Sequence, residues 1–252
     1  MKVRILSDLH LSQNSYFELT DKDIFTIIAG DISKDIFQLK SWLKQNVKNG
    51  LFILGNHDFT GNMNMKDAYF QLKEEFPVTE NLAFLQNSYK EIDNKIFVGA
   101  TLWTDLELKI NNPIFEPNKS TNHLHSYIRG NFSKDQKLSP DITIREFNKS
   151  LNYIDFLCKE NPTKDIVVIT HHCPSIKCSA EKFIHNIMNP ALISNLEDFI
   201  INRKNIKYWI CGHCHRDPIQ FEIGQCKVLM NTRGYCKFNE CPSFKEDFIV
   251  EM

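Results

Sequence analysis

Short apolar runs alternate with amphipathic stretches along most of this 252-residue chain. The runs rich in Val, Ile, Leu and Phe indicate buried strands, which we expect at 3–6, 24–29, 51–54, 83–85, 96–98, 166–169, 208–210 and 248–250. Apolar residues at helical spacing predict helices at 35–47, 65–75, 142–158 and 190–201. Two further runs, at 219–223 and 227–230, flank Gly224 and predict an antiparallel hairpin.

The order of these elements predicts the fold class. Strands that alternate with helices, as in parallel sheets, come first, and hairpin-type strands come later. A sheet buries its apolar faces by packing on another sheet or on helices. We therefore expect a mixed α/β (α+β) fold in which sheets pack together with helices outside.

The hydrophobic pattern weakens between about 105 and 140, where the chain is polar and contains three prolines and a glycine. A stretch of this length without regular structure is usually functional or disordered. We interpret it as an insertion or cap-like segment near the functional site, and a solvated surface loop is the alternative. The length, with 42 % hydrophobic residues, otherwise fits one domain spanning 1–252.

Composition excludes few function classes but lowers the odds of some. A net charge of -1 gives no strong signal for nucleic-acid binding. The N-terminus lacks the apolar region of a signal peptide, and no run of about 18 apolar residues predicts a membrane span. We therefore expect a cytoplasmic protein without a membrane partner, whose eight cysteines are free thiols.

Potential metal ligands follow five of the predicted strands. Loops beyond the carboxyl ends of strands in an open α/β sheet converge on one crevice, so ligands far apart in sequence can meet there. Six of the nine histidines belong to these clusters. The clusters are Asp8-Leu9-His10, Gly30-Asp31, Gly55-Asn56-His57-Asp58, His171-His172 and Gly212-His213-Cys214-His215. Imidazole, carboxylate and amide groups together suit Mn, Fe, Zn or similar ions.

In their order, these clusters resemble the five motifs of the calcineurin-like metallophosphoesterases, and the resemblance spans Asp8 to His215. It implies a four-layer sandwich of two mixed β-sheets flanked by helices. It also implies two divalent or trivalent metal ions. By this resemblance the first ion is held by Asp8, His10 and His215, the second by Asn56, His171 and His213, and Asp31 bridges both. His57 resembles the family's site histidine that does not bind metal.

This ligand set predicts hydrolysis of a phosphate ester by a metal-bridging hydroxide. Two cations about 3.5–4 Å apart can bind one water, lower its pKa and offset charge on the phosphoryl oxygens. His57 would stabilise that charge or protonate the leaving oxygen, and we expect Asp58 to orient His57. These two residues are the predicted catalytic side chains.

The substrate class follows from what the chain lacks. Protein Ser/Thr phosphatases carry an arginine shortly after the bridging aspartate and another just before Gly-Asn-His. Here Asp31 is followed by Ile-Ser-Lys, and Leu54 precedes Gly55. Without these clamps for a dianion, we favour a phosphodiesterase acting on a small, nucleotide-like diester. A phosphomonoesterase of the same fold, or a non-catalytic metal-binding protein, are the alternatives.

Four residues are candidate substrate contacts: His123, His125 and Arg129 in the insertion, and Arg233 after the hairpin. Solvated positions, or an ion pair for Arg233, are the competing interpretations.

The Cys211-Gly-His-Cys214 spacing also fits a structural zinc or redox site, which we place second because His213 and His215 already belong to the five motifs. Cys236 and Cys241 are the pair that the sequence suggests for completing such a zinc site.

Overall fold

The computed structural model describes residues 1–14, 16–109 and 130–252. Its strands are β1 Lys2–Leu6, β2 Phe25–Ala29, β3 Gly50–Ile53, β4 Leu82–Phe84, β5 Ser88–Ile92, β6 Lys95–Ala100, β7 Asn131–Ser133, β8 Gln136–Lys137, β9 Asp165–Thr170, β10 Ile206–Cys211, β11 Ile219–Ile223, β12 Cys226–Met230 and β13 Ile249–Glu251. Its α-helices are α1 Ile36–Asn46, α2 Met65–Glu75, α4 Pro140–Glu160 and α5 Glu197–Ile201. Short 3₁₀ turns lie at 57–59, 176–178, 181–183, 189–191 and 236–238.

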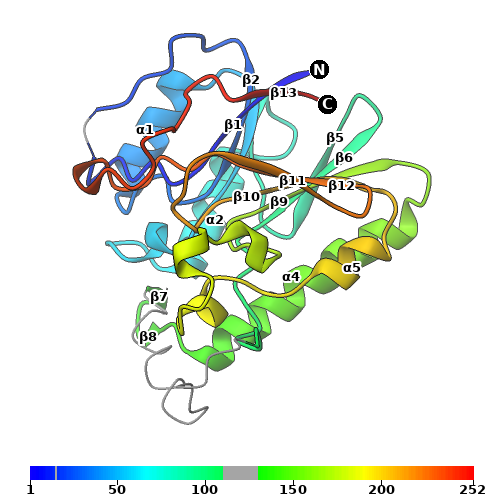
Figure 1. The fold of residues 1–252 in the computed structure, drawn as a ribbon. Coiled ribbons are helices and arrows are strands. Elements are labelled where there is room, and N and C mark those ends of the chain that lie inside the picture. Colours follow the sequence, from blue (N-terminus) through cyan, green and yellow to red (C-terminus); the bar gives the residue numbers. More distant parts are fainter. Residues whose placement is uncertain (15, 110–129) are drawn as a thin grey trace.

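Apart from β7 and β8, which pair only with each other, the strands form two mixed sheets, which confirms the predicted four-layer sandwich (Figure 1). The five-stranded sheet has the order β13-β1-β2-β3-β4, with β13 antiparallel to β1 and the other neighbours parallel. The six-stranded sheet has the order β11-β12-β10-β9-β6-β5, with antiparallel hairpins at both edges and parallel strands between.

Alternate residues of the strands fill two different cores. One core lies between the sheets and contains Ile27 and Leu51 of the five-stranded sheet with Val167 and Ile210 of the other. The intervening residues face outward and pack on the amphipathic helices, because successive side chains of a strand point to opposite faces. On α1 the buried residues are Leu39, Trp42, Leu43 and Asn46.

Local sequence signals set the helix starts. The Asp35 carboxylate accepts hydrogen bonds from the backbone N–H groups of Phe37 and Gln38, so it caps the first turn of α1. Ser139 caps α4 in the same way, and Pro140 occupies its first position, where a missing N–H has no cost.

One helix prediction was wrong in part, and one strand of the two sheets was not predicted. The helix expected at 190–201 is a 3₁₀ turn followed by the short α5, because Ser194 N–H and Leu196 N–H bond to the carbonyls of Cys173 and Pro174. The edge strand β5 was missed, since its residues alternate between exposed and half-buried positions and give little apolar signal. The C-terminal part of the predicted insertion contains the β7–β8 hairpin, and its residues 110–129 lie outside the described part.

Within the described residues, none of the helices is both long enough and apolar enough to span a bilayer. All eight cysteines are free, as expected. The two sheets meet at one end, where the Ser7 N–H donates to the carbonyl of Asn231 and the Arg233 N–H donates to the carbonyl of Ser7. The carboxyl ends of β1, β2, β3, β9 and β10 point to this end, so the five predicted ligand clusters are brought to one place.

Candidate dinuclear metal centre

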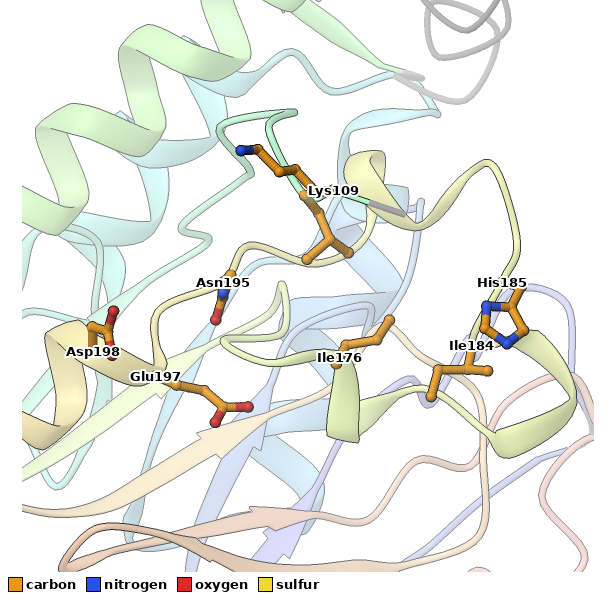
Figure 2. A pocket seen from close by; sticks show the side chains of 8 residues that line it. Lys109, Ile176, Ile184, His185, Asn195, Glu197 and Asp198 are labelled. Carbon is orange, nitrogen blue, oxygen red and sulfur yellow. The ribbon is translucent and has the colours of Figure 1, made fainter. Parts of the chain in front are cut away.

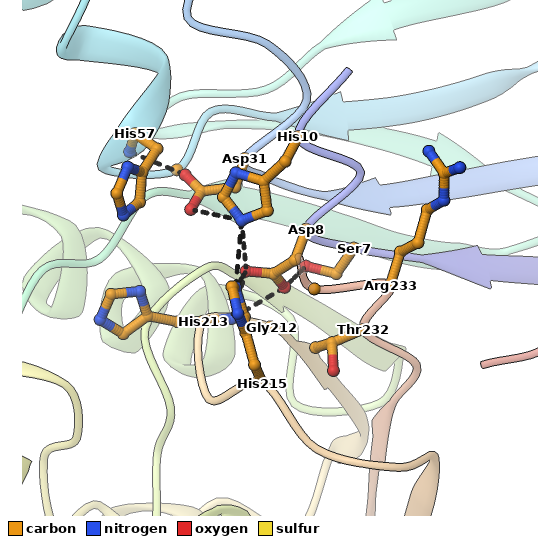
Figure 3. Close-up of polar contacts among 12 residues, drawn as sticks. Ser7, Asp8, His10, Asp31, His57, Gly212, His213, His215, Thr232 and Arg233 are labelled. Carbon is orange, nitrogen blue, oxygen red and sulfur yellow. Dashed lines mark hydrogen bonds and ion pairs between the residues drawn. The ribbon is translucent and has the colours of Figure 1, made fainter. Parts of the chain in front are cut away.

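The backbone turns sharply where the ligand-bearing strands end. Asp8, His10, Asp31 and His213 all have positive φ angles, of 55°, 44°, 53° and 68°. Such angles are uncommon for residues with a Cβ atom and are typical of functional sites. The turns direct these side chains into the junction between the sheets instead of along the strands, as Figure 3 shows.

The first group of ligands consists of Asp8, His10 and His215, whose donor atoms all lie within 4.8 Å of one another. The Nε2 atoms of His10 and His215 are 3.0 Å apart, and His215 Nε2 is 3.2 Å from Asp8 Oδ1. Asp8 is fully buried and its Oδ2 accepts a hydrogen bond from Ser7 Oγ at 2.6 Å. The three residues therefore present their donor atoms to one shared point.

The second group consists of Asp31, His171 and His213, with Asn56 beside it. The Nε2 atom of His171 lies 3.1 Å from Asn56 Oδ1, 3.1 Å from His213 Nδ1 and 3.4 Å from Asp31 Oδ2. On the other side of its ring, His171 Nδ1 lies 2.8 Å from the carbonyl oxygen of Ala29, which orients Nε2 toward the group.

Asp31 lies between the two groups. Its Oδ2 is 3.8 Å from His10 Nε2 and 3.4 Å from His171 Nε2. This oxygen is buried and has no hydrogen-bond partner. The Nε2 atom of His213 is also buried and without a hydrogen-bond partner. Orphaned buried polar atoms are costly unless an unrecorded partner satisfies them. Nitrogen atoms that face each other at 3.0–3.1 Å also need a cation or a shared proton between them. The donor set thus fits two metal ions that share the Asp31 carboxylate.

Two glycines permit this crowding. A Cβ atom at Gly55 would overlap Asp31 Oδ1, and one at Gly212 would overlap Ser7 Oγ. The glycines that the sequence motifs carry are therefore required by the close approach of the ligand side chains.

Electrostatic effects on the histidines have opposite signs. Burial lowers the pKa of His10 to about 4, against the attraction of Asp31 and Asp8. Burial also disfavours charge on His171 and His215, but Asp31 raises the pKa of His171 to about 9, and Asp8 with Glu240 raises the pKa of His215 to about 10. The carboxylates thus attract positive charge to the positions where the sequence predicts metal ions.

Asp58 does not lie against His57 in the way that we expected from the sequence. Its Oδ2 accepts hydrogen bonds from the N–H groups of Asp31 and Gly55, and its Oδ1 accepts one from Ser33 N–H. Among the described residues, no hydrogen bond joins it to His57. Its contacts instead clamp the loops after β2 and β3 together.

His57 lies at the rim of the site and is half-buried. Its ring contacts His10 edge-on, with 5.2 Å between ring centroids, and the backbone N–H of His57 donates to Asp31 Oδ1 at 2.8 Å. The side chain is outside both ligand groups but close enough to reach a substrate bound to them. Its role in the reaction stays a prediction.

Sequence reasoning missed two residues of the site. Glu240 Oε2 lies 2.6 Å from His215 Nδ1, and the ring of Tyr235 stacks on His10 with centroids 4.4 Å apart. Both belong to the loop after β12, beyond the five motifs. The sequence contains an Arg-Gly-Tyr segment there but nothing that marks Glu240 as a partner of His215.

Of the four predicted substrate contacts, one lies within the described residues. His123, His125 and Arg129 lie outside the described residues. Arg233 Nη1 donates to the carbonyl of Leu9 at 3.4 Å, and its guanidinium lies 4.6 Å from the ring centroid of Phe17. In Figure 3 this side chain extends away from the histidines.

Two pockets differ in their relation to the metal ligands. A pocket of about 360 Å³ adjoins His213 and His215, and its other lining residues include Lys182, Phe183 and Asn186. A second pocket, of about 410 Å³, lies near α5 and contains none of the predicted ligands (Figure 2). Of the two, only the first adjoins predicted metal ligands.

Comparison with known proteins identifies one relative by sequence and two by structure. The chain is 28 % identical over 268 residues to the uncharacterized protein L509 of Acanthamoeba polyphaga mimivirus, covering 92 % of this chain and 91 % of the relative. Among solved structures, it resembles the phosphopantetheinyl hydrolase PptH of Mycobacterium tuberculosis, with a TM-score of 0.71, 13 % identity, and 94 % and 91 % of the two chains covered. A dimetal phosphatase of Danio rerio has a TM-score of 0.49 at 12 % identity, with 93 % and 88 % covered.

The family model for calcineurin-like phosphoesterases matches residues 1–217, a range that contains every predicted metal ligand. This range ends two residues after His215, where the last of the five motifs ends. The chain therefore belongs to the calcineurin-like phosphoesterase family and is a metal-dependent phosphoester hydrolase.

Proposed function

We propose that this enzyme is a dinuclear phosphodiesterase that cleaves a small, nucleotide-like phosphodiester. The observation that carries the dinuclear assignment is the position of Asp31 Oδ2, buried and unpartnered within 4 Å of ring nitrogens from both ligand groups. One ion would be held by Asp8, His10 and His215. The other would be held by Asn56, His171 and His213, and the Asp31 carboxylate would bind both ions. Mn, Fe, Zn or similar ions suit these nitrogen and oxygen donors.

When bound, such an ion pair lowers the pKa of water and offsets negative charge on a phosphoryl group. The protein's own contribution is to hold the ester and move protons. His57, beside His10 and half-exposed, is placed to donate a proton to the leaving oxygen. Asp58, through its hydrogen bonds to the N–H groups of Asp31 and Gly55, keeps the loops that carry Asp31 and His57 in place.

The pocket beside His213 and His215 supports a diester over a monoester. Lys182 is the one lysine or arginine among its described lining residues, and the arginines that clamp dianionic monoesters in protein phosphatases are absent from the corresponding motifs. A diester carries one negative charge, so it needs fewer cationic contacts. The volume of about 360 Å³ and the ring of Phe183 suit an organic group of nucleotide size on one side of the phosphate.

A phosphomonoesterase of the same fold is the second candidate. The experiment that separates the two compares initial rates on a chromogenic phosphodiester and on its monoester analogue, with protein stripped of metal and reloaded with manganese. We expect diester turnover well above monoester turnover, and loss of both in Asp31→Asn. Monoester turnover that exceeds diester turnover would contradict the proposal.

The pocket itself is tested with nucleotide diesters. Lys182→Ala and Phe183→Ala should raise KM for a nucleotide diester by about tenfold, while kcat on the small chromogenic diester stays close to that of the original chain. Lys204→Ala, at an exposed position after α5, is the matched control and should change neither value. Equal effects on both substrates would place the nucleotide group elsewhere.

A further inference from the structure

Three cysteines form a second cluster of potential ligands, separate from the two histidine-rich groups, and a fourth follows one of them closely in the sequence. The Sγ atoms of Cys173, Cys178 and Cys211 all lie within 4.8 Å of one another, and all three side chains are fully buried. The Sγ atoms of Cys178 and Cys211 are 3.8 Å apart. Cys214, three residues after Cys211, is also buried. We call these four residues the thiol cluster.

The spacing of these sulfur atoms fits a metal ion and does not fit a disulfide. Zinc binds thiolates at about 2.3 Å in tetrahedral geometry, which places sulfur atoms about 3.8 Å from each other. A disulfide requires sulfur atoms about 2.05 Å apart. The separation of 3.8 Å between Cys178 and Cys211 is the value expected for two ligands of one zinc ion.

We propose that the thiol cluster binds one zinc ion, a third metal site in addition to the dinuclear centre. Cys173 and Cys178 supply one pair of ligands with four residues between them, and Cys211 and Cys214 supply the other with two. Soft thiolate donors select zinc over the ions that prefer oxygen ligands. Cys236 and Cys241, the partners that the sequence suggested, do not take part, since Cys236 is exposed and Cys241 Sγ lies 3.4 Å from Thr232 Oγ1.

The thiol cluster joins the two loops that carry three of the dinuclear ligands. Cys173 follows His171 by two residues, Cys211 precedes His213 by two, and Cys214 lies between His213 and His215. In the structure the loops already touch, because the Gly212 N–H donates to the carbonyl of His171 and Cys173 Sγ donates to the carbonyl of Gly212 at 3.0 Å. A zinc ion here would fix the relative position of His171 and His213.

The surroundings supply positive charge for a thiolate cluster. Arg216 Nη1 donates to the carbonyls of Lys177 and Ser179, the residues on either side of Cys178. A guanidinium therefore lies beside the loop that carries Cys178. Such charge compensation is what a buried group of thiolates requires.

The direct test uses the full chain, kept reduced and treated with a mild chelator that removes the exchangeable dinuclear pair. We expect one zinc per chain to remain, and X-ray absorption at the zinc edge to show sulfur neighbours at about 2.3 Å. Retained zinc without a sulfur shell, or no retained zinc, would overturn the proposal. This measurement needs no substitution, so it does not depend on how a variant folds.

Cobalt substitution tests which residues bind the ion. Protein reloaded with cobalt should show a thiolate-to-cobalt charge-transfer band, which should weaken in Cys178→Ser, where one thiolate is lost, and stay unchanged in Cys158→Ser, a buried cysteine outside the cluster. The band should persist in Asp31→Asn, which disables the dinuclear centre alone. A band of unchanged intensity in Cys178→Ser, or one that disappears in Asp31→Asn, would contradict the assignment.

Titration of thiols in denaturant distinguishes a zinc site from an oxidised pair. Zinc-bound protein should yield all eight thiols once a strong chelator is added. Two fewer thiols, recovered only after a reductant, would show a disulfide in place of the zinc ion.

Discussion

Glu240 Oε2 lies 2.6 Å from Nδ1 of His215, while Nε2 of the same ring faces Asp8 and His10. A carboxylate on the far nitrogen of a metal-binding histidine fixes its tautomer and increases its affinity for metal. Replacing Glu240 with Gln should therefore weaken binding of the ion at His215 by about 10–100-fold. Metal affinity is measured by calorimetric titration, and bound metal per chain is the second readout.

Glu222→Gln is the matched control, because Glu222 is exposed on the edge strand β11. It should leave metal affinity unchanged. Equal affinities for the two variants would mean that the contact between Glu240 and His215 does not orient the ring.

A second prediction concerns the contribution of Asp58 to the stability of the fold. Because its carboxylate accepts hydrogen bonds from three backbone N–H groups, Asp58→Ala should lower the free energy of unfolding by about 2–3 kcal/mol. Asp58→Asn keeps an acceptor oxygen and should lose less. Thermal unfolding of the metal-free protein is the measurement, and Asp23→Asn at an exposed position is the control.

The original expectation that Asp58 orients His57 makes a different prediction for the same variant. In that case Asp58→Asn would lower turnover while the unfolding temperature stayed the same. Turnover and stability measured on one preparation therefore decide between the two roles.

His57 is expected to act on the reaction and not on metal binding. His57→Ala should lower kcat by about a hundredfold to ten-thousandfold, the usual contribution of a general acid, while the bound metal per chain is unchanged. His185→Ala, an exposed histidine that lines the pocket near α5, is the control and should be fully active. Loss of metal in His57→Ala would place this ring among the ligands instead.

Metal binding should release protons at pH 7. The pKa of His171 is raised to about 9 and that of His215 to about 10 in the metal-free protein, so both rings are protonated there, whereas a bound metal requires them neutral. Metal affinity should therefore rise as the pH increases from 7 to about 10. Calorimetric titrations in two buffers of different ionisation enthalpy measure the release, and identical heats in both would contradict it.

The same shifts determine how these two rings affect stability. A histidine whose pKa is raised from 6.5 stabilises the metal-free fold fully below pH 6.5, and this contribution is lost as the pH rises through about 9 to 10. In Glu240→Gln the free energy of unfolding should fall less over this pH range, because Glu240 helps to raise the pKa of His215.

Much of the fold and the residues that meet in the candidate metal centre could be predicted from the sequence, because the relevant signals are local. Each ligand lies within a few residues of a strand end, and parallel strands bring such ends together whatever the rest of the chain does. The glycines of the motifs mark the positions where side chains approach most closely. The seven ligands named from the motifs all lie in or beside the two groups that the structure shows.

Other features depend on contacts between segments far apart in sequence. Residues 190–201 have helical spacing, but their backbone bonds instead to Cys173 and Pro174. The pairing of Glu240 with His215 and the meeting of Cys178 with Cys211 leave no periodic or motif signal. The sequence by itself determined which residues can hold metal, because ligand type and strand-end position are local properties. Only the tertiary structure decided which side chains support those ligands, because a hydrogen bond or a sulfur contact forms only when folding places both partners within a few ångströms.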